Sequence, residues 1–423
     1  MRISFPYSEK EIGGVEIEDG LVAGVYEPKA GPAPDETLVE MVRDAIERPI
    51  GSPALGERAR GAKRVTIVAD DISRTTPVRE MLPVILETLN AAGVKDSQMT
   101  GLVALGTHRD MTPAEMDARY GRRHTSRIRF VNHAWRDGKA LVDLGRTTVG
   151  IPVRVNRLVA EADLVVGIGH IVPHGTAGFS GGAKIIMPGA SGAETVGATH
   201  WKSLDYPPHE TFGCRNNPIR EAMDEIVRKL GNVFIVNAVP RPDGRPQAVF
   251  AGDPVLAHAD GCAATVAIYG ARVRERTNIV LTDAYPTDID LRQAIKAVYA
   301  ASLVVRDGGT IVLVSPCPEG VAPQFPEFVA VGFRRAAEIR KLVDEKRLDP
   351  TAGYTLGCIG EILARPVRVI AATPGVTADE MRRLFFVPAG SAQEGLDLAV
   401  RMTREPRVTV LRHGGEILPI VAG

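Results

Sequence analysis

The sequence of 423 residues predicts an α/β protein with two α/β domains, each built on a mostly parallel sheet, and an active site in the crevice between them. Short apolar runs rich in β-branched residues alternate with segments of helical periodicity, which is typical of βαβ units. The chain is also longer than most single domains. Polar segments follow several predicted strands, at the end of a parallel sheet where ligands collect.

The first domain is expected over residues 1–272. Its strands are predicted at four buried apolar runs, 65–70, 99–106, 162–168 and 233–239. A helix is expected from about Val78 to Ala92, because that segment has helical periodicity and a glycine follows it. Thr112 and Glu115 have the spacing of a capping box, which predicts the start of another helix.

The second domain is expected over residues 273–404, after a polar, weakly patterned stretch at 271–278. Its strands are predicted at 278–283, 310–315, 367–372 and 408–412, and its helices at 289–303, 332–346 and 353–364. The last strand and the tail, about 405–423, could return to the first domain. The sequence contains no internal repeat.

Composition excludes several functional classes. Lys+Arg and Asp+Glu number 51 each, so the chain has no general attraction for nucleic acid or anionic lipid. The four cysteines are scattered without a CxxC pair, which argues against a zinc ribbon or a disulfide framework and fits a reducing compartment. No signal peptide and no apolar run of about 20 residues is present. We therefore expect a cytoplasmic protein that binds neither nucleic acid nor membrane.

The most informative segment is GHIVPHGTAGFSGGAKIIMPGASG at residues 169–192. Consecutive backbone N–H groups in such a glycine-rich run can form an anion-binding nest. The candidate cofactor-binding residues are Gly178, Ser180, Gly181, Gly182 and Lys184. The run matches neither the Walker A pattern nor GxGxxG, and a plain flexible loop is the alternative. A lysine in this setting can also form a covalent link.

Three histidines are functional candidates. His108 and His174 each follow a predicted strand end close to a glycine, and two histidines facing one ligand could act as acid and base. His200 is a candidate metal ligand, and His170 is expected to support the site. The remaining histidines are expected to be structural or solvated, namely His124, His133, His209, His258 and His413.

Two further pairs are candidates for substrate contacts. Arg74 suits a bidentate grip on a carboxylate, and Asp71 could orient either Arg74 or a catalytic histidine. A local salt bridge that closes the turn is the alternative for this pair. Gln293 and Lys296 are three residues apart on one predicted helix face, from which both could reach a substrate. The alternative there is an ordinary solvated face.

Taken in order, these segments resemble the nickel-pincer lactate racemase (LarA) superfamily of 2-hydroxyacid racemases and epimerases. The markers are Asp71-x-x-Arg74, GTHRxMT at 106–112, Pro173-His174, GFSGGxK at 178–184, His200 and Gln293-x-x-Lys296. The resemblance covers nearly the whole chain. Each marker is weak alone, whereas their order and spacing together are specific.

The resemblance implies a cofactor, a set of residue roles and a reaction. Lys184 would carry the nickel-pincer nucleotide, a pyridinium-3,5-bisthiocarboxylic acid mononucleotide, through a thioamide bond, and His200 would complete the nickel coordination. Asp71 and the glycine-rich segment would hold the cofactor. His108 and His174 would be acid and base in a reversible hydride transfer, with substrate held by Arg74, Gln293 and Lys296. The implied partners are the cofactor-assembly enzymes, namely a carboxylase/hydrolase, a sulfur transferase and a nickel insertase.

Two departures from that family concern the substrate. Arg292 stands where a lactate enzyme is expected to have tyrosine, and this cation could pair with a second carboxylate, as in malate. An exposed helix position is the alternative for Arg292. No tryptophan occurs in residues 354–362, where lactate racemases carry one. Two other functions stay open: a non-covalent sugar-acid or nucleotide-binding protein, and a metal-dependent hydrolase or dehydratase using the same histidines.

Overall fold

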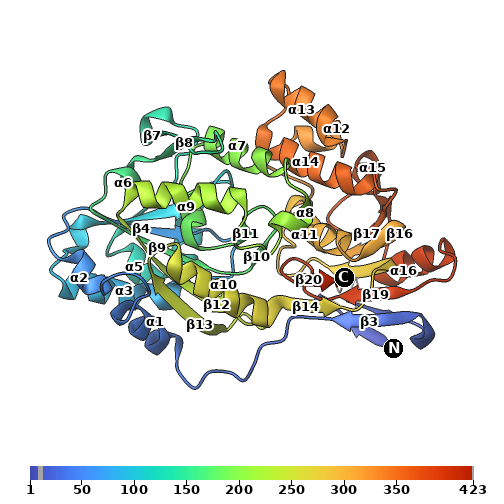
Figure 1. Ribbon diagram of the computed structural model, residues 1–423, viewed down its shortest axis with the longest axis horizontal. Helices are drawn as coiled ribbons and strands as arrows, with labels where there is room; N and C mark the ends of the chain where they lie inside the picture. Colours follow the sequence, from blue (N-terminus) through green and yellow to red (C-terminus); the bar gives the residue numbers. More distant parts are fainter. Residues whose placement is uncertain (8–12, 422–423) are drawn as a thin grey trace. The chain divides into compact units, whose positions relative to one another are not determined.

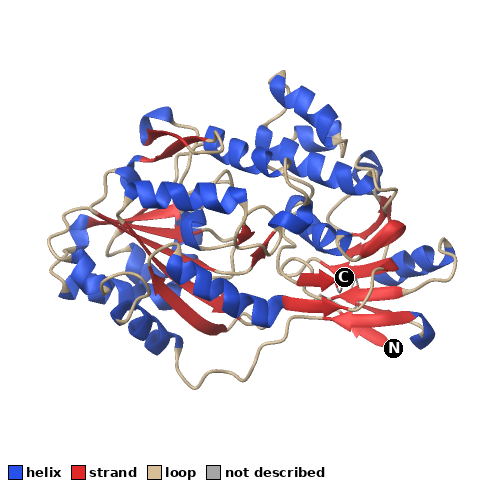
Figure 2. Cartoon of the chain, viewed as in Figure 1, coloured by secondary structure: helices blue, strands red, loops and turns tan. Residues whose placement is uncertain are grey.

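The computed structural model, drawn in Figure 1, describes residues 1–7 and 13–421 and divides into two compact units. Unit 1 contains Met1–Lys29, Leu204–His209 and Tyr269–Gly423, and unit 2 contains Ala30–Ser203 and Glu210–Ile268. Each unit has one six-stranded sheet flanked by helices, as the secondary-structure colouring of Figure 2 shows. The predicted class, an α/β protein with two mainly parallel sheets, is therefore confirmed.

The sheet of unit 2 has the order β13-β12-β9-β4-β5-β6. Its strands are β4 (Val65–Asp70), β5 (Met99–Ala104), β6 (Arg129–Asn132), β9 (Leu164–His170), β12 (Val233–Pro240) and β13 (Pro246–Gly252). Only the β12–β13 pair is antiparallel. Every residue of β4 is buried, and Val65, Ile67 and Ala69 face the core formed with α1 (Leu38–Glu47), α2 (Leu55–Ala59) and α3 (Val78–Ala91). This core fixes the central strand, whose carboxyl end carries Asp70 and Asp71.

Shorter elements complete unit 2. Strands β7 (Leu141–Arg146) and β8 (Pro152–Asn156) pair antiparallel, as do the two-residue strands β10 (Pro173–His174) and β11 (Gly178–Phe179). The remaining helices are α4 (Pro113–Met116), α5 (Arg122–Thr125), α6 (Arg157–Ala160), α7 (Ala193–Ser203), α9 (Pro218–Leu230) and α10 (Leu256–Tyr269). Single turns lie at η2 (Asp96–Gln98), η3 (Asp117–Gly121), η4 (Gly138–Ala140) and η5 (Gly182–Ile185), and α8 (Pro208–Thr211) lies where the chain passes from one unit to the other.

The sheet of unit 1 is entirely parallel, with the order β18-β17-β16-β15-β19-β3. Its strands are β3 (Val22–Tyr26), β15 (Thr277–Asp283), β16 (Val305–Val314), β17 (Arg368–Ala372), β18 (Val387–Pro388) and β19 (Val408–Leu411). Its helices are α11 (Leu291–Ser302), α12 (Glu327–Val331), α13 (Ala336–Asp344), α14 (Pro350–Leu363), α15 (Ala378–Arg383) and α16 (Ala392–Arg401), with a single turn at η1 (Asp19–Leu21). Two further pairs, β1 (Arg2–Ser4) with β2 (Gly14–Glu16) and β14 (Gly270–Val273) with β20 (Leu418–Val421), complete this unit.

The division of the chain differs from the expected domains at both termini. The first 29 residues belong to unit 1 rather than to an N-terminal domain of residues 1–272, because β3 pairs in parallel with β19. The tail at 405–423 also stays in unit 1, where β19 pairs with β15 and β20 pairs with β14. The β3–β19 pairing joins residues almost 400 positions apart, so it leaves no local pattern in the sequence.

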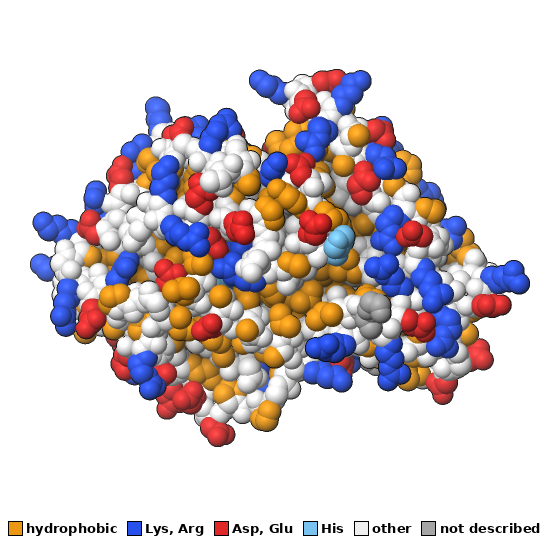
Figure 3. Space-filling view, viewed as in Figure 1, with side chains coloured by type: hydrophobic (Ala, Val, Ile, Leu, Met, Phe, Trp, Pro, Cys, Tyr) orange, Lys and Arg blue, Asp and Glu red, His pale blue; other side chains and the backbone are white. Residues whose placement is uncertain are grey.

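The surface agrees with the balanced composition. In Figure 3, acidic and basic side chains are intermixed over the face that is shown. Among the described residues, no helix is long and apolar enough to cross a membrane.

Candidate functional site

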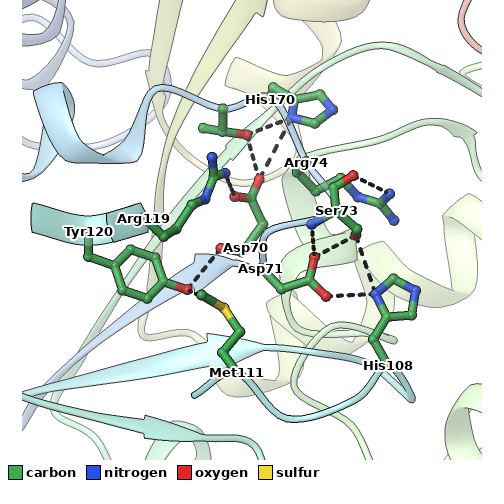
Figure 4. Close-up of polar contacts among 10 residues, drawn as sticks. Asp70, Asp71, Ser73, Arg74, His108, Met111, Arg119, Tyr120 and His170 are labelled. Carbon is green, nitrogen blue, oxygen red and sulfur yellow. Dashed lines mark hydrogen bonds and ion pairs between the residues drawn. The ribbon is translucent and has the colours of Figure 1, made fainter. Parts of the chain in front are cut away.

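Asp71 and His108 come together at the carboxyl ends of the adjacent strands β4 and β5. His108 Nδ1 lies 2.6 Å from Asp71 Oδ2, and the Ser73 hydroxyl donates to Asp71 Oδ1 over 2.5 Å. Figure 4 shows the three side chains pointing toward one another. Because parallel strands end at the same edge of a sheet, two loops far apart in sequence meet here. Of the alternatives for Asp71, the structure therefore favours a contact with a histidine.

The surroundings of Asp71 keep its carboxylate ionised. Burial alone would raise the pKa of Asp71, but His108, Arg74 and the Ser73 hydroxyl lower it well below its usual value overall. Within the described residues, the Arg74 guanidinium makes no ion pair, and its one hydrogen bond is to the Ser73 carbonyl oxygen at 3.4 Å. The alternative for this pair, a local salt bridge between Asp71 and Arg74, does not form among the described residues. The Arg74 guanidinium is thus not committed to an internal carboxylate.

A second hydrogen-bond network, also drawn in Figure 4, holds the same loop through Asp70 and Thr76. Asp70 is buried and accepts hydrogen bonds from Thr76 Oγ1 at 2.5 Å and Arg119 Nη2 at 2.7 Å. Thr76 Oγ1 also lies 2.5 Å from His170 Nδ1. The loop is therefore fixed at Asp70 and Thr76, and Asp71 and Arg74 lie between these two anchors.

His174 is held by a turn of its own backbone. It pairs with Gly178 across the short β10–β11 hairpin. Its Nδ1 accepts hydrogen bonds from the backbone N–H groups of Thr176 at 3.2 Å and Ala177 at 3.3 Å. The two candidate acid–base histidines therefore have different partners at the same ring nitrogen.

Close packing explains the three glycines of the segment that precedes Lys184. Gly178, Gly181 and Gly182 have φ values of +74°, +72° and +59°, a region that favours glycine. A Cβ on Gly182 would lie 2.6 Å from His258 Cγ, and one on Gly181 would lie 2.8 Å from Asn237 Oδ1. On Gly178 it would collide with the Cys214 carbonyl oxygen. These glycines are required for internal packing, whatever the segment binds.

A fully buried arginine on α9 holds this segment in place. The Arg220 guanidinium donates to three carbonyl oxygens, those of Ala177 at 3.1 Å, Gly181 at 3.2 Å and Phe179. His258 Nε2 contacts the Ser180 carbonyl oxygen at 2.8 Å. Burying a charge is costly unless it is well satisfied, and these carbonyls supply Arg220 with acceptors. The glycine-rich segment is thus preformed rather than flexible.

Two of the expected phosphate donors of this segment already have internal partners. The Ser180 hydroxyl donates to the His170 carbonyl oxygen at 2.8 Å and accepts from the Val172 N–H. The Gly182 N–H donates to Asn237 Oδ1 at 2.7 Å. This differs from the nest that the sequence suggested, because both donors serve the fold. These internal hydrogen bonds fix the segment that leads to Lys184 and so position this lysine.

Lys184 lies in η5 with a half-buried side chain. Its amine makes no hydrogen bond or ion pair with any described residue. Burial lowers the pKa of Lys184, the neighbouring Arg74 and Arg220 lower it further, and Asp71 opposes them, so that the value falls to about 7. A large fraction of the amine is therefore neutral near neutral pH and can act as a nucleophile.

His200 lies on α7, and its Nδ1 donates to the Val196 carbonyl oxygen one turn earlier, at 2.8 Å. This bond fixes the ring proton on Nδ1 and leaves the lone pair of the neutral ring on Nε2, the tautomer that a metal ligand needs. No group of three or more His, Cys, Asp or Glu side chains suited to a metal ion occurs in the described residues.

The remaining candidates, Arg292, Gln293 and Lys296, lie on α11 in unit 1. Asp290 caps this helix and accepts from the Gln293 N–H at 2.7 Å. Gln293 is buried, and its Oε1 has no hydrogen-bond partner among the described residues. The Arg292 guanidinium carbon lies 5.4 Å from the centroid of the Phe325 ring. Arg292 is thus partly packed, not simply solvated.

The sequence did not indicate several residues that shape this site. Ser73 could have been identified from the sequence, because it lies two residues after Asp71 in the same loop. Arg220, His258 and Asn237 come from three distant elements, and His258 was predicted to be structural. A buried arginine in an otherwise ordinary amphipathic helix has no local signature, so tertiary structure alone identifies it.

The fold and the site define an α/β protein in which an aspartate–histidine pair lies at the carboxyl ends of two parallel strands, near a lysine with a lowered pKa. The lactate racemase N-terminal domain matches residues 7–211 of this chain. The chain is 30% identical over 429 residues to the lactate racemase of Thermoanaerobacterium thermosaccharolyticum, with 98% of each chain covered. It is 31% identical over 321 residues to that of Lactiplantibacillus plantarum, with 75% of each covered. The chain therefore belongs to the lactate racemase family, a family of isomerases, which confirms the resemblance.

Solved structures agree with this assignment. The lactate racemase apoprotein from T. thermosaccharolyticum superposes with a TM-score of 0.88 and 27% sequence identity, covering 100% of both chains. A Thermotoga maritima protein has the same fold, with a TM-score of 0.73, 21% identity and coverage of 93% of this chain and 100% of its own.

Proposed function

We propose that this protein is a 2-hydroxyacid racemase or epimerase that uses a nickel-pincer nucleotide tethered to Lys184. The observation that carries the proposal is the Lys184 amine, which is half-buried, has no partner among the described residues and has a pKa lowered to about 7. A thioamide link requires a neutral amine as nucleophile, and this environment supplies one. Membership of the lactate racemase family supports the same reading.

The residues present fit such a group. Lys184 would tether it, and His200 would offer Nε2 to nickel, because its Nδ1 proton is committed to Val196. Imidazole with soft sulfur ligands is a donor set that suits nickel in planar geometry. When bound, the cofactor supplies reversible acceptance of the substrate α-hydrogen as hydride. Asp71, Gly178, Ser180, Gly181 and Gly182 would surround the cofactor. Ser180 and Gly182 would act indirectly, because their hydrogen bonds hold the segment that leads to Lys184.

The side chains of this protein would bind the substrate and move its hydroxyl proton. Arg74 makes no internal ion pair and can grip the substrate carboxylate through two parallel hydrogen bonds. His108 and His174 would handle the hydroxyl proton, and Asp71 would stabilise the charge that His108 gains. On α11, Lys296 would add a second cation for the substrate. The Gln293 Oε1, which has no partner among the described residues, could accept a hydrogen bond from the substrate. Retention of a keto acid between half-reactions favours a closed site.

Mass spectrometry tests the covalent link directly. The full chain is produced in a host that carries the cofactor-assembly enzymes, and the peptide containing Lys184 is weighed while nickel is quantified. A mass increment on that peptide with nearly one nickel per chain supports the proposal, and Lys184→Arg should lose both. Active protein with an unmodified Lys184 would refute it. That result would favour a non-covalent binding protein or a hydrolase instead.

For the substrate, we propose a 2-hydroxy acid with a second carboxylate, such as malate, because Arg292 adds a cation beside Gln293, on the helix for which the family resemblance implies substrate contacts. Its guanidinium packs near Phe325, which limits its motion. A panel of single-enantiomer 2-hydroxy acids, followed by circular dichroism, should show faster turnover of malate than of lactate. Arg292→Tyr should reverse that order. Faster turnover of lactate by the unaltered chain would exclude this role for Arg292.

A further inference from the structure

Lys184 lies on a turn that packs against two central strands of the unit 2 sheet. That turn, η5, contacts β4 and β9, and β4 leads directly into the loop that carries Asp71 and Arg74. The Lys184 side chain is half-buried, and its amine makes no hydrogen bond or ion pair with any described residue. The segment before it is fixed by Arg220, so the amine is held in a defined place.

The charges around the Lys184 amine favour an anionic reactant. Arg74 and Arg220 both disfavour protonation of the amine, and Asp71 opposes them. Asp71 is already paired with His108 at 2.6 Å, and Arg220 donates to main-chain carbonyl oxygens. The Arg74 guanidinium, by contrast, makes no ion pair among the described residues. An incoming carboxylate would therefore bind Arg74, close to a neutral amine.

We propose that the chain without its cofactor captures 2-keto acids as an imine at Lys184, with the carboxylate of the keto acid bound to Arg74. The neutral amine adds to the keto carbon, its two hydrogens leave with the carbonyl oxygen as one water molecule, and a C=N bond replaces the C=O bond. No metal, oxidant or reductant takes part. A neighbouring cation activates a lysine amine for such chemistry by favouring its neutral form.

This capture and the attachment of the cofactor exclude each other, because both use the nitrogen of Lys184. A chain that already carries the cofactor has no amine left for a keto acid. The inference rests on the proposed function for the role of Arg74 as the carboxylate ligand. It goes beyond that function, since it gives the unloaded chain a covalent chemistry of its own toward the class of compound that forms when a 2-hydroxy acid loses hydride.

Reductive trapping tests the capture without any racemisation. The full chain, produced in a host without the cofactor-assembly enzymes, is mixed with pyruvate and sodium cyanoborohydride, which reduces an imine to a stable secondary amine. The peptide containing Lys184 should gain the mass of one reduced pyruvate at least about 10-fold faster than the peptide with the exposed Lys63 in the same digest. Lys184→Arg should remove the fast labelling. Labelling of Lys184 no faster than that of Lys63 would overturn the proposal.

Pyruvamide separates the carboxylate contact from the reactivity of the amine, because it has the same keto group without the charge. With rates taken relative to Lys63, Lys184 should trap pyruvate about 10–100-fold faster than pyruvamide, the effect of a charge-assisted hydrogen bond. Arg74→Gln should remove this preference. Arg60→Gln, which changes an exposed arginine of the same unit, should keep it. Equal relative rates for the two ketones would contradict the binding of the carboxylate by Arg74.

Failure of this inference is distinguishable from failure of the proposed function. If the loaded protein racemises a 2-hydroxy acid while the unloaded chain traps no pyruvate at Lys184, the inference is wrong and the proposed function stands. If the unloaded chain traps pyruvate while active protein from the host with the assembly enzymes carries an unmodified Lys184, the proposed function is wrong and the capture stands.

Discussion

Replacing Gly182 by alanine should destabilise unit 2 by a predictable amount. At φ +59° a side chain costs about 1–2 kcal/mol relative to glycine, and the loss of unfolded-state freedom returns about 0.4–1 kcal/mol. The added Cβ would meet the His258 ring at 2.6, 2.8 and 3.0 Å, and such overpacking costs about 1–3 kcal/mol more. We therefore expect the free energy of unfolding to fall by about 1–5 kcal/mol.

Gly61→Ala is the matched control, because Gly61 lies in the same unit at φ +79° with nothing within 4 Å of an added Cβ. The backbone terms are common to both variants, so their difference isolates the contact with His258, about 1–3 kcal/mol. The two tryptophans, Trp135 and Trp201, both lie in unit 2, so tryptophan fluorescence during urea unfolding reports on this unit. Equal losses for Gly182→Ala and Gly61→Ala would refute the close packing of the segment before Lys184.

Three further predictions concern charged groups. Asp71→Asn removes a charge-assisted hydrogen bond of 2.6 Å to His108, worth about 1.5–3 kcal/mol. It should lower kcat/KM for racemisation by about 10–100-fold in steady-state assays. A change below about two-fold would show that this contact has no role in the reaction. Arg74→Lys loses bidentate geometry without breaking an internal ion pair, so KM should rise while the urea midpoint stays constant. Burial raises the pKa of Asp283 to about 7, although hydrogen bonds from the His413 and Tyr285 N–H groups lower it. The protonated carboxyl group therefore contributes stability that is complete below about pH 4 and is lost as the pH rises to 7. Asp283→Asn should flatten the dependence of the free energy of unfolding on pH between about 4 and 7.

The buried strands of both sheets could be predicted from the sequence because they are short apolar runs with local signals at both ends. Strand β4 is buried at every position and matches its predicted range, 65–70. Strand β3 was not predicted, since its residues VAGVY are only partly buried and lie at the edge of the sheet. Its place depends on pairing with β19, a contact that no local window contains.

The candidate site was also only partly predictable from the sequence. Asp71 and His108 follow adjacent parallel strands, so their convergence could be expected from the order of the strands alone. The partners of the His108 and His174 ring nitrogens could not, because they are a carboxylate from another loop and two backbone N–H groups. The role of Arg220 was equally hidden, since its three acceptors are main-chain carbonyls, which carry no residue identity.

The pairing of β3 with β19 also orders events during synthesis on the ribosome. Unit 2, which carries Lys184, is fully translated once residue 268 has emerged. Strand β3, the first strand of the six-stranded sheet of unit 1 in chain order, is complete at residue 26 and must wait until its partner at 408–411 leaves the exit tunnel. A nascent chain therefore carries an unpaired β-edge for most of its synthesis, the kind of exposed segment that chaperones protect. Loss of the final strands would leave β3 without a partner while the lysine-bearing unit keeps every strand of its own sheet.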